Sequence, residues 1–193
     1  VVGRALETSR LKRENESLKG RAGADSELHG SSVAMRQLRQ LLKKIAPANS
    51  RVLISGDMGT GKELTARMLH ALSTRAEGPF VTLSAATMAP ERMEEELFGI
   101  EAAPGIEQRV GALEEAHGGT LFIDEVADMP LVTQGKVLRV LLDQTFQRVG
   151  GAKKVRVDVR IVSSTSRDLV SLIAENKFRE DLYYRINVIE LRV

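Results

Sequence analysis

The apolar positions of the chain fall into short runs, separated by longer stretches of mixed polarity. Four of the runs read as strands: RVLIS at 51–55, PFVTLSA at 79–85, TLFID at 120–124 and DVRIVSS at 158–164. Between them, apolar residues recur every three or four positions, as they do on one face of a helix. Short strands that alternate with helices predict an α/β fold, in which helices cover both faces of a parallel sheet.

The helical patterns lie before and between these runs. The first one places a set of apolar side chains on one side of a helix: Met35, Leu38, Leu41, Leu42 and Ile45. Further helices are predicted in ELTARMLHALS, ERMEEELF and LVTQGKVLRVLLDQ, and a hairpin in QRVGGAKKVRV. The final INVIELRV is strand-like and has no closing turn, so we expect the chain to be part of a longer protein.

The amino-terminal segment differs in composition from the rest. Residues 1–22 are charged and helical in pattern, and GRAGADSELHGSS at 20–32 is rich in Gly, Ser and Ala, which is typical of a boundary. The first segment fits either a short dimerising or linking helix or a solvated connector, because its heptad positions are only partly aliphatic. We expect one domain after this boundary, over residues 27–193.

Composition excludes several classes of protein. The chain has no cysteine, so it can form neither a disulfide framework nor a thiolate metal site. It lacks both the core of a signal peptide and an apolar run near the roughly 20 residues that cross a bilayer, which favours the cytoplasm. A net charge of +2 is too small to indicate nucleic-acid binding by this segment.

One short segment nearly matches a phosphate-binding loop. GDMGTGKE, from Gly56 to Glu63, follows a predicted strand and opens a predicted helix, which points backbone N–H groups and the helix dipole at an anion. Lys62 would reach the β- and γ-phosphates. The last position, where a hydroxyl usually holds magnesium, is the carboxylate of Glu63.

A second segment lies about 60 residues further on. TLFIDE places Asp124 and Glu125 at the carboxyl end of a strand, the edge at which ligands bind in open α/β sheets. Asp124 is the candidate partner of Mg²⁺, through water, and Glu125 would polarise the attacking water. An Asp-Glu pair by itself also fits a charged end of a strand, but the loop upstream favours a nucleotide site.

A third segment, FREDLYYRIN, contains Arg179 and Arg185. Phosphoryl-transfer sites often use an arginine to stabilise the charge that builds up in the transition state. The alternative is that both are surface arginines paired with Glu180 or Asp181, and the residues alone do not decide between the two.

Taken in order, the segments GTGKELTARMLH, EELFG, GGTLFIDEV, LRVL, QRVGG and FREDLYYRINV resemble the central AAA+ domain of bacterial enhancer-binding proteins. These proteins regulate sigma-54 RNA polymerase. Within the family, the sequence of these segments is most similar to that of a response regulator of nitrogen metabolism. The resemblance covers about residues 27–193. It implies a three-layer P-loop NTPase with a mostly parallel sheet, whose helical lid would lie beyond Val193. Because the loops of this family ordinarily end in GTGKE, Glu63 is the family's own residue.

The resemblance also implies a set of site residues. Adenine would lie near Leu28, His29 and Gly30. ATP would be bound at Gly56, Asp57, Met58, Gly59, Thr60, Gly61, Lys62 and Glu63, and at Ala116, His117, Gly118, Gly119, Thr120, Leu121, Phe122, Ile123 and Asp124. The catalytic residues would be Glu125, Arg179 and Arg185, with the arginines reaching the ATP of a neighbouring subunit, and Asp124 would hold Mg²⁺.

The implied partners are other copies of the chain, from dimer to ring. A sensor kinase would act through a missing receiver domain, DNA would bind a missing carboxy-terminal domain, and RNA polymerase is a further candidate. A membrane is not among them.

The sequence departs from the family at three places. ELFG at 96–99 is followed by IEAAPGIEQRVG, which lacks the GAFTGA motif that touches the sigma factor, and we read residues 100–110 as a plain connecting loop. Ser84 and Ser166 replace two asparagines, one that pairs with the catalytic glutamate and one that senses the nucleotide. Serine keeps a hydroxyl but loses the reach of the amide and its simultaneous donor and acceptor.

Two functions remain after these departures. In the first, ATP supports assembly and is hydrolysed weakly, without contact to sigma-54 through GAFTGA. In the second, the domain is an active ring-forming ATPase that drives sigma-54-dependent transcription. The departures favour the first, and the intact loop, acidic pair and arginines support the second.

Overall fold

The computed structural model describes residues 30–193. Its centre is a five-stranded sheet in the order β2-β3-β6-β1-β7, in which every pair of neighbours is parallel. The strands are β1 (Val52–Ser55), β2 (Phe80–Ser84), β3 (Thr120–Asp124), β6 (Arg160–Thr165) and β7 (Ile189–Arg192). The predicted α/β fold with a parallel sheet is confirmed.

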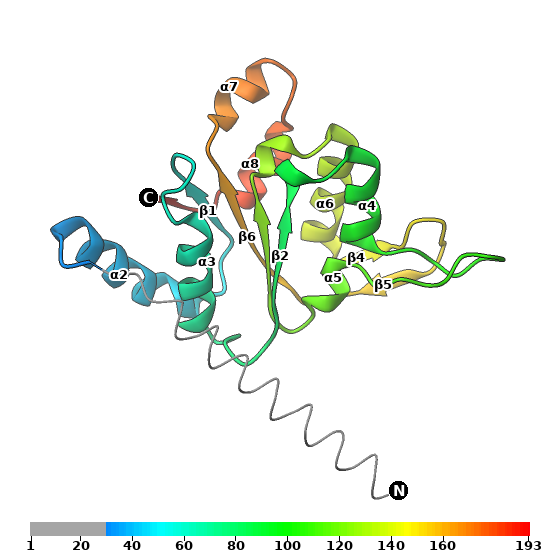
Figure 1. Cartoon of the computed structure of the whole chain (residues 1–193), viewed down its shortest axis with the longest axis horizontal. Helices are drawn as coiled ribbons and strands as arrows, with labels where there is room; N and C mark the ends of the chain where they lie inside the picture. The colour runs from blue at the N-terminus through cyan, green and yellow to red at the C-terminus, as the bar shows by residue number, and fades with distance from the viewer. Residues whose placement is uncertain (1–29) are drawn as a thin grey trace, which may run out of the picture.

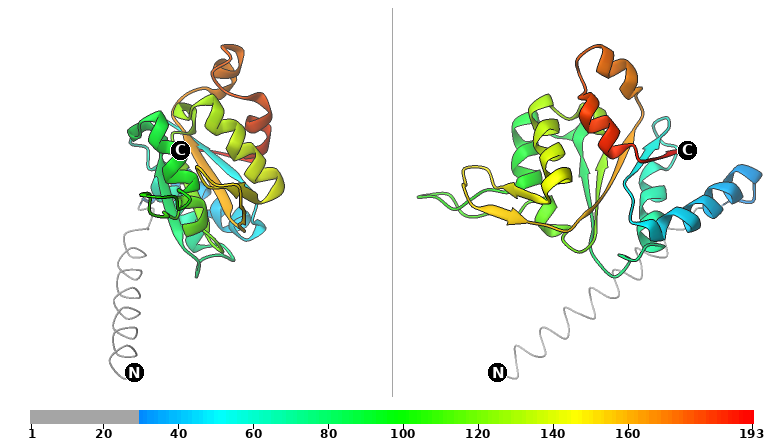
Figure 2. Two further views of the ribbon diagram at one scale, coloured as in Figure 1. Left: turned by 90° about the vertical axis from the view of Figure 1, so that its right-hand side faces the viewer. Right: turned by 180° about the vertical axis from the view of Figure 1, so that it is seen from behind.

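Helices cover both faces of the sheet and complete three layers (Figure 1). On one face lie α2 (Val33–Ile45) and α3 (Lys62–Ala71). On the other lie α4 (Pro90–Phe98), α5 (Ala112–Glu115), α6 (Leu131–Asp143), α7 (Leu169–Ala174) and α8 (Glu180–Ile186), with α8 beside α6 (Figure 2). No helix between residues 30 and 193 is long and apolar enough to cross a membrane.

Each face of the sheet has its own apolar core, because side chains alternate along a strand. Phe122 and Val162 pack under α2 and α3, whereas Leu121, Ile123 and Ile161 pack under α4 to α8. The predicted apolar side of α2 is confirmed in part: Leu42 and Ile45 are buried, but Leu41 is exposed. Single-turn elements, η1 (Ala46–Ala48), η2 (Ala85–Thr87) and η3 (Val126–Asp128), complete the connections.

The predicted hairpin is present as β4 (Thr145–Gln147) and β5 (Lys154–Arg156), which pair antiparallel. The prediction of a plain loop over residues 100–110 is wrong. Ile100 forms β-bridges with both Arg109 and Val149, so the loop folds back on itself and joins the hairpin.

Arg148 holds this arrangement together with charge-assisted hydrogen bonds. Its guanidinium donates to both carboxylate oxygens of Glu114, each at 2.7 Å, and to Glu101 at 3.2 Å. These bonds to Glu114 and Glu101 outweigh burial and raise the pKa of Arg148. Sequence pattern could not show this link, because the three residues come from separate segments.

The central strand β6 contains a buried hydroxyl without a hydrogen-bond partner. Ser163 is 1% exposed, and among residues 30–193 its Oγ meets no donor or acceptor. A buried polar group that is left unsatisfied costs about 1–3 kcal/mol.

We therefore expect Ser163→Ala to stabilise the domain by about 1 kcal/mol, because alanine removes the unsatisfied hydroxyl and leaves almost no space. Chemical denaturation of both proteins measures the difference. A loss of stability in the alanine variant would show that this hydroxyl is solvated or bonded in solution.

Candidate nucleotide-binding site

The glycine-rich loop lies between β1 and α3 at the carboxyl edge of the sheet (Figure 1). Gly56 donates its N–H to the carbonyl of Thr165 on β6, and a Cβ at Gly56 would collide with the carbonyl oxygen of Val193. Gly61, at the start of α3, has φ of 89°, a left-handed value that favours glycine. The loop therefore needs glycine at both its ends.

Lys62, the first residue of α3, folds its side chain back into this loop. Its Nζ donates to the carbonyls of Gly56 and Asp57, each at 3.0 Å, and lies 3.1 Å from Oε1 of Glu125. Lys62 and Glu125 are each only 7% exposed. The structure thus brings together the loop and the acidic pair, which are remote in the chain, as the sequence predicts.

Glu125 is held from two sides. One carboxylate oxygen meets Lys62, and the other accepts hydrogen bonds from the backbone N–H of Ser166 at 2.8 Å and from its hydroxyl at 2.9 Å. Burial alone would raise the pKa of Glu125, but these hydrogen bonds and the charge of Lys62 bring it below its ordinary value. The carboxylate is therefore charged at neutral pH and fixed in direction.

The two serine positions play unequal parts in holding Glu125. Ser84 lies opposite Asp124 in the register of β2 and β3, but its hydroxyl makes no hydrogen bond to Glu125 within the described part of the chain. Ser166 makes the contact instead. Sequence analysis missed a third serine, Ser164, whose hydroxyl bonds both Asp124 and the backbone of Glu125. Its only signal is its place two residues before Ser166.

Glu63 does not take the place of the missing loop hydroxyl. Its carboxylate accepts from Arg67, one turn further along α3, at 2.7 Å and 3.1 Å. Among residues 30–193 no group of three His, Asp or Glu side chains could hold a metal ion. Mg²⁺ commonly uses one or two carboxylates together with phosphate oxygens and water, so Asp124 as the single carboxylate ligand fits that ion.

The segment 116–120 lies at the amino-terminal ends of the strands, opposite to the ends that carry the glycine loop. Gly118 bonds the carbonyl of Asp158, and Thr120 bonds that of Pro79; these two partners precede the strands β6 and β2. The length of β3 separates this edge from Asp124 by about 13 Å. The predicted site Ala116–Thr120 is therefore not brought to the loop of its own chain, and Leu121–Ile123 are core residues.

The remaining predicted residues are scattered. Leu28 and His29, like the predicted linker 1–22, lie outside the described residues. Gly30 is exposed, and its carbonyl accepts from Arg39. Arg179 pairs with Asp181 at 2.7 Å, which agrees with the alternative that it is a paired surface arginine. Arg185 lies exposed on α8. Neither arginine joins Lys62 in this chain.

A cavity of about 300 Å³ opens beside the loop. Its lining combines the loop, the ends of the central strands and the helices α7 and α8: Leu53, Ser55, Gly56, Asp57, Thr165, Ser166, Arg167, Asp168, Leu169, Val170, Tyr183, Asn187, Glu190 and Arg192. The cavity gives a ligand bound at the loop room to extend along the carboxyl edge of β1 and β6.

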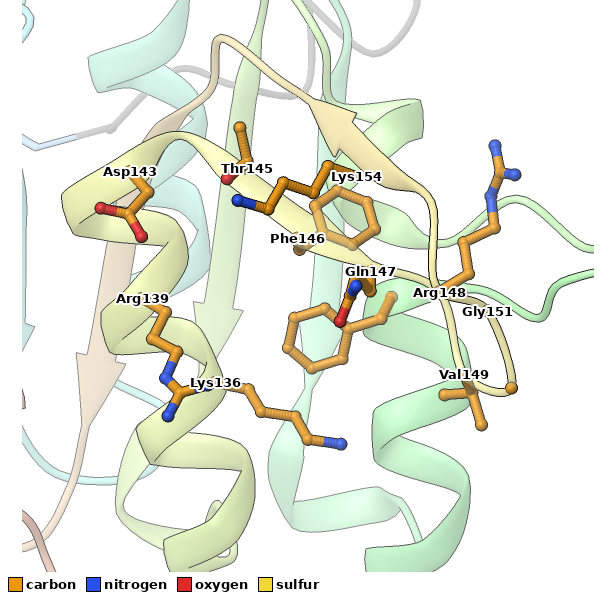
Figure 3. Close-up of a pocket in the computed structure, with 12 residues that line it drawn as sticks. Lys136, Arg139, Asp143, Thr145, Phe146, Gln147, Arg148, Val149, Gly151 and Lys154 are labelled. Atoms are coloured by element: carbon orange, nitrogen blue, oxygen red, sulfur yellow. The ribbon is translucent and has the colours of Figure 1, made fainter.

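A larger cavity, of about 480 Å³, lies elsewhere, between α6 and the hairpin. Figure 3 shows Lys136 and Arg139 projecting from α6 and Phe146 and Lys154 from the hairpin. Lys136 pairs with Glu94, and Arg148 pairs with Glu101 and Glu114. These carboxylates offset much of the positive charge that lines the cavity. It contains no residue of the predicted site, and size alone does not make it the nucleotide pocket.

A glycine loop between a parallel strand and a helix, with its lysine facing an Asp-Glu pair at the end of a second strand of the same sheet, defines a P-loop NTPase domain. A model of one family, described as the Sigma-54 interaction domain, matches residues 28–192. The chain belongs to this family.

Known relatives give the same result. The chain is 57% identical, over its whole length, to the nitrogen assimilation regulatory protein NtrX of Azorhizobium caulinodans, and it spans 42% of that protein. Crystal structures of NtrX from Brucella abortus in complex with ADP and with ATP are each 60% identical, with TM-scores of 0.87 and 0.85. The matches include all of this chain, which spans 43% of the ADP-bound and 44% of the ATP-bound NtrX chain. The resemblance to nitrogen regulators is thereby confirmed.

The depressed pKa of Glu125 predicts a pH dependence of stability. Because the folded state binds this proton less readily than the unfolded state, the contribution is present at neutral pH. It is lost as pH falls below the ordinary value of about 4.3. Glu125→Gln should therefore lower the free energy of unfolding at pH 7 by about 1–3 kcal/mol and flatten its acid dependence.

Denaturation of both proteins between pH 7 and pH 3 measures this effect, with Glu91→Gln on the exposed face of α4 as the control. An equal acid dependence in the Glu125 variant and in the wild type would contradict the ion pair.

Proposed function

We propose that this chain is the ATP-binding central domain of an NtrX-like two-component transcriptional regulator, in which ATP supports oligomer assembly and is hydrolysed slowly. The observation that carries the proposal is the contact of 3.1 Å between Lys62 and Glu125 inside the glycine loop. It puts a cation, a carboxylate and the start of α3 at one point.

Each group has a role that follows from its place. The loop amides from Gly56 to Gly61 and the ammonium of Lys62 would bind phosphate oxygens. Asp124 would hold Mg²⁺ through water, the ion supplying charge neutralisation of the phosphates when bound. Glu125 would orient the attacking water as a general base. Arg179 and Arg185 would act on the ATP of a neighbouring subunit, which suits their exposure here.

The serines at positions 84 and 166 support slow turnover. Within residues 30–193, Ser84 makes no hydrogen bond to Glu125, and the carboxylate is held by Lys62 and Ser166. Loss of one donor that stabilises the transition state commonly costs about 100- to 1,000-fold in rate. The loop and Lys62 are unaffected by these serines, so affinity should persist while hydrolysis falls.

The loop over residues 100–110 supports the absence of a GAFTGA contact to sigma-54. Its sequence, IEAAPGIEQRV, has no Phe-Thr pair, and it is bonded to the hairpin through Ile100 and Arg148. The alternative function is an active ring-forming ATPase that drives sigma-54-dependent transcription. The family match and the presence of Lys62, Asp124 and Glu125 favour it.

The wider assignments follow from the relatives. The regulator would be cytoplasmic and receive its signal from a sensor kinase through a receiver domain. It would bind DNA through a further domain, with RNA polymerase as a candidate partner. The chain spans 42% of the NtrX of Azorhizobium caulinodans and 43% of the ADP-bound NtrX structure, so these functions would belong to segments outside it.

We expect the full-length protein to bind ATP with Mg²⁺ tightly and to turn it over slowly, because the binding groups are present and the support of Glu125 is reduced. Nucleotide titration beside steady-state phosphate release measures both quantities. Lys62→Ala should abolish binding. A turnover rate equal to that of an active member of the family would refute slow hydrolysis.

Ser84→Asn combined with Ser166→Asn tests the cause. The two amides should raise turnover at least tenfold with little change in ATP affinity, because they act on Glu125 and not on the loop. If turnover stays the same, the slow rate has another origin.

Capture of sigma-54 separates the two functions. With an ATP transition-state mimic, the full-length protein should retain no sigma-54, because the loop that would contact it lacks the motif. An active family member serves as the positive control, and retention equal to that control would favour the ATPase alternative.

A further inference from the structure

Ser164 connects the two acidic residues of the site, so any role for it rests on the proposed nucleotide-binding function. It lies in β6, is fully buried, and faces Ile54 of β1 in the register of the sheet. Its Oγ donates to Oδ1 of Asp124 and accepts the backbone N–H of Glu125 at 3.0 Å. One hydroxyl therefore bonds two consecutive residues of the neighbouring strand.

The bond to Glu125 lies just beyond the end of the sheet pairing. The pairing of β3 with β6 ends at Ile123 and Ser163, two residues before Glu125. Glu125 then turns out of the strand with φ of 52°, a left-handed value that is costly for a residue with a side chain. The hydroxyl of Ser164 satisfies the buried N–H at this turn and so stabilises it.

The bond to Asp124 orients its carboxylate. Ser164 donates to Oδ1, and within residues 30–193 the other oxygen, Oδ2, makes no hydrogen bond, which leaves it for a ligand. A serine hydroxyl has one hydrogen to donate, and here the accepted bond from Glu125 fixes the direction in which that hydrogen points. The two bonds thus support each other.

We propose that Ser164 is a positioning residue, which holds Asp124 in the orientation that binds Mg²⁺ with the nucleotide and fixes the backbone from which Glu125 projects. It acts through these two residues and does not itself touch the ligand. Ser164 in β6 and Ser166 directly after β6 thus provide two hydroxyls that hold the acidic pair, on the side of β3 away from Ser84.

Ser163 provides a matched control. It is the preceding residue of the same strand, is equally buried, and carries the same hydroxyl, which faces the other side of the sheet and has no partner in the described range. Ser163→Ala and Ser164→Ala therefore remove the same atom from the same strand, but only the second breaks contacts with the acidic pair.

The experiment measures the affinity of the full-length protein for a fluorescent ATP analogue, once with Mg²⁺ and once with EDTA. The ratio of the two affinities reports the part of binding that depends on the metal. We expect Ser164→Ala to reduce this ratio about tenfold, because a hydrogen bond to a charged group is lost, and to leave the affinity in EDTA within about twofold. Ser163→Ala should leave the ratio unchanged.

Two additions keep the test decisive. Ser164→Cys fills the space of the side chain with a weak donor and leaves no cavity, so it should behave as Ser164→Ala does if the lost hydrogen bonds are the cause. Hydrogen exchange of the Glu125 amide, measured without nucleotide, should accelerate at least tenfold in both Ser164 variants and not in Ser163→Ala.

The outcomes separate this inference from the proposed function. If the wild type binds no nucleotide in either condition, the proposed function fails, and exchange at Glu125 alone decides whether Ser164 holds the turn. If the wild type binds nucleotide, either of two results would show that Ser164 has no positioning role. In the first, Ser163→Ala and Ser164→Ala both keep the wild-type ratio of the two affinities. In the second, both variants reduce it.

Discussion

The site depends on a single buried ion pair, between the ammonium of Lys62 and the carboxylate of Glu125. The two residues are 63 positions apart, and they meet only because β1 and β3 run parallel on either side of β6. Removing one partner of a buried pair leaves the other charge buried without compensation. The order of the strands, the left-handed turn at Glu125 and the glycines of the loop are all arranged around this contact.

The strands and the longer helices could be predicted from the sequence, because apolar periodicity reports burial directly. The loop and the acidic pair could be placed together from their positions at the ends of parallel strands. The short helices α5, α7 and α8 were not assigned from pattern, since a single turn or two carries little periodicity. The folded-back loop at Ile100 was missed for another reason, because its bonds to Val149 and Arg148 join distant segments.

The structure brings together only part of the predicted site, and it adds Ser164 as a contact of the acidic pair. Residues 116–120 precede β3, and a motif read along the sequence does not show that a strand carries its two ends to opposite edges of the sheet. Ser164 could not be singled out, because the sequence does not show which of the consecutive serines 163 and 164 has a hydroxyl that meets the acidic pair. What distinguishes the two is the face of the sheet onto which each hydroxyl points.

Arg148 has a mechanical consequence. Its guanidinium is shared between Glu101 in the loop and Glu114 in α5, and its own backbone lies in the hairpin segment. α5 ends at Glu115, and β3 begins at Thr120 and ends at Asp124, so Arg148 ties the loop to the segment that leads directly into the strand of the acidic pair. The position of the loop relative to that strand is therefore set by ion pairs as well as by the backbone bridges at Ile100.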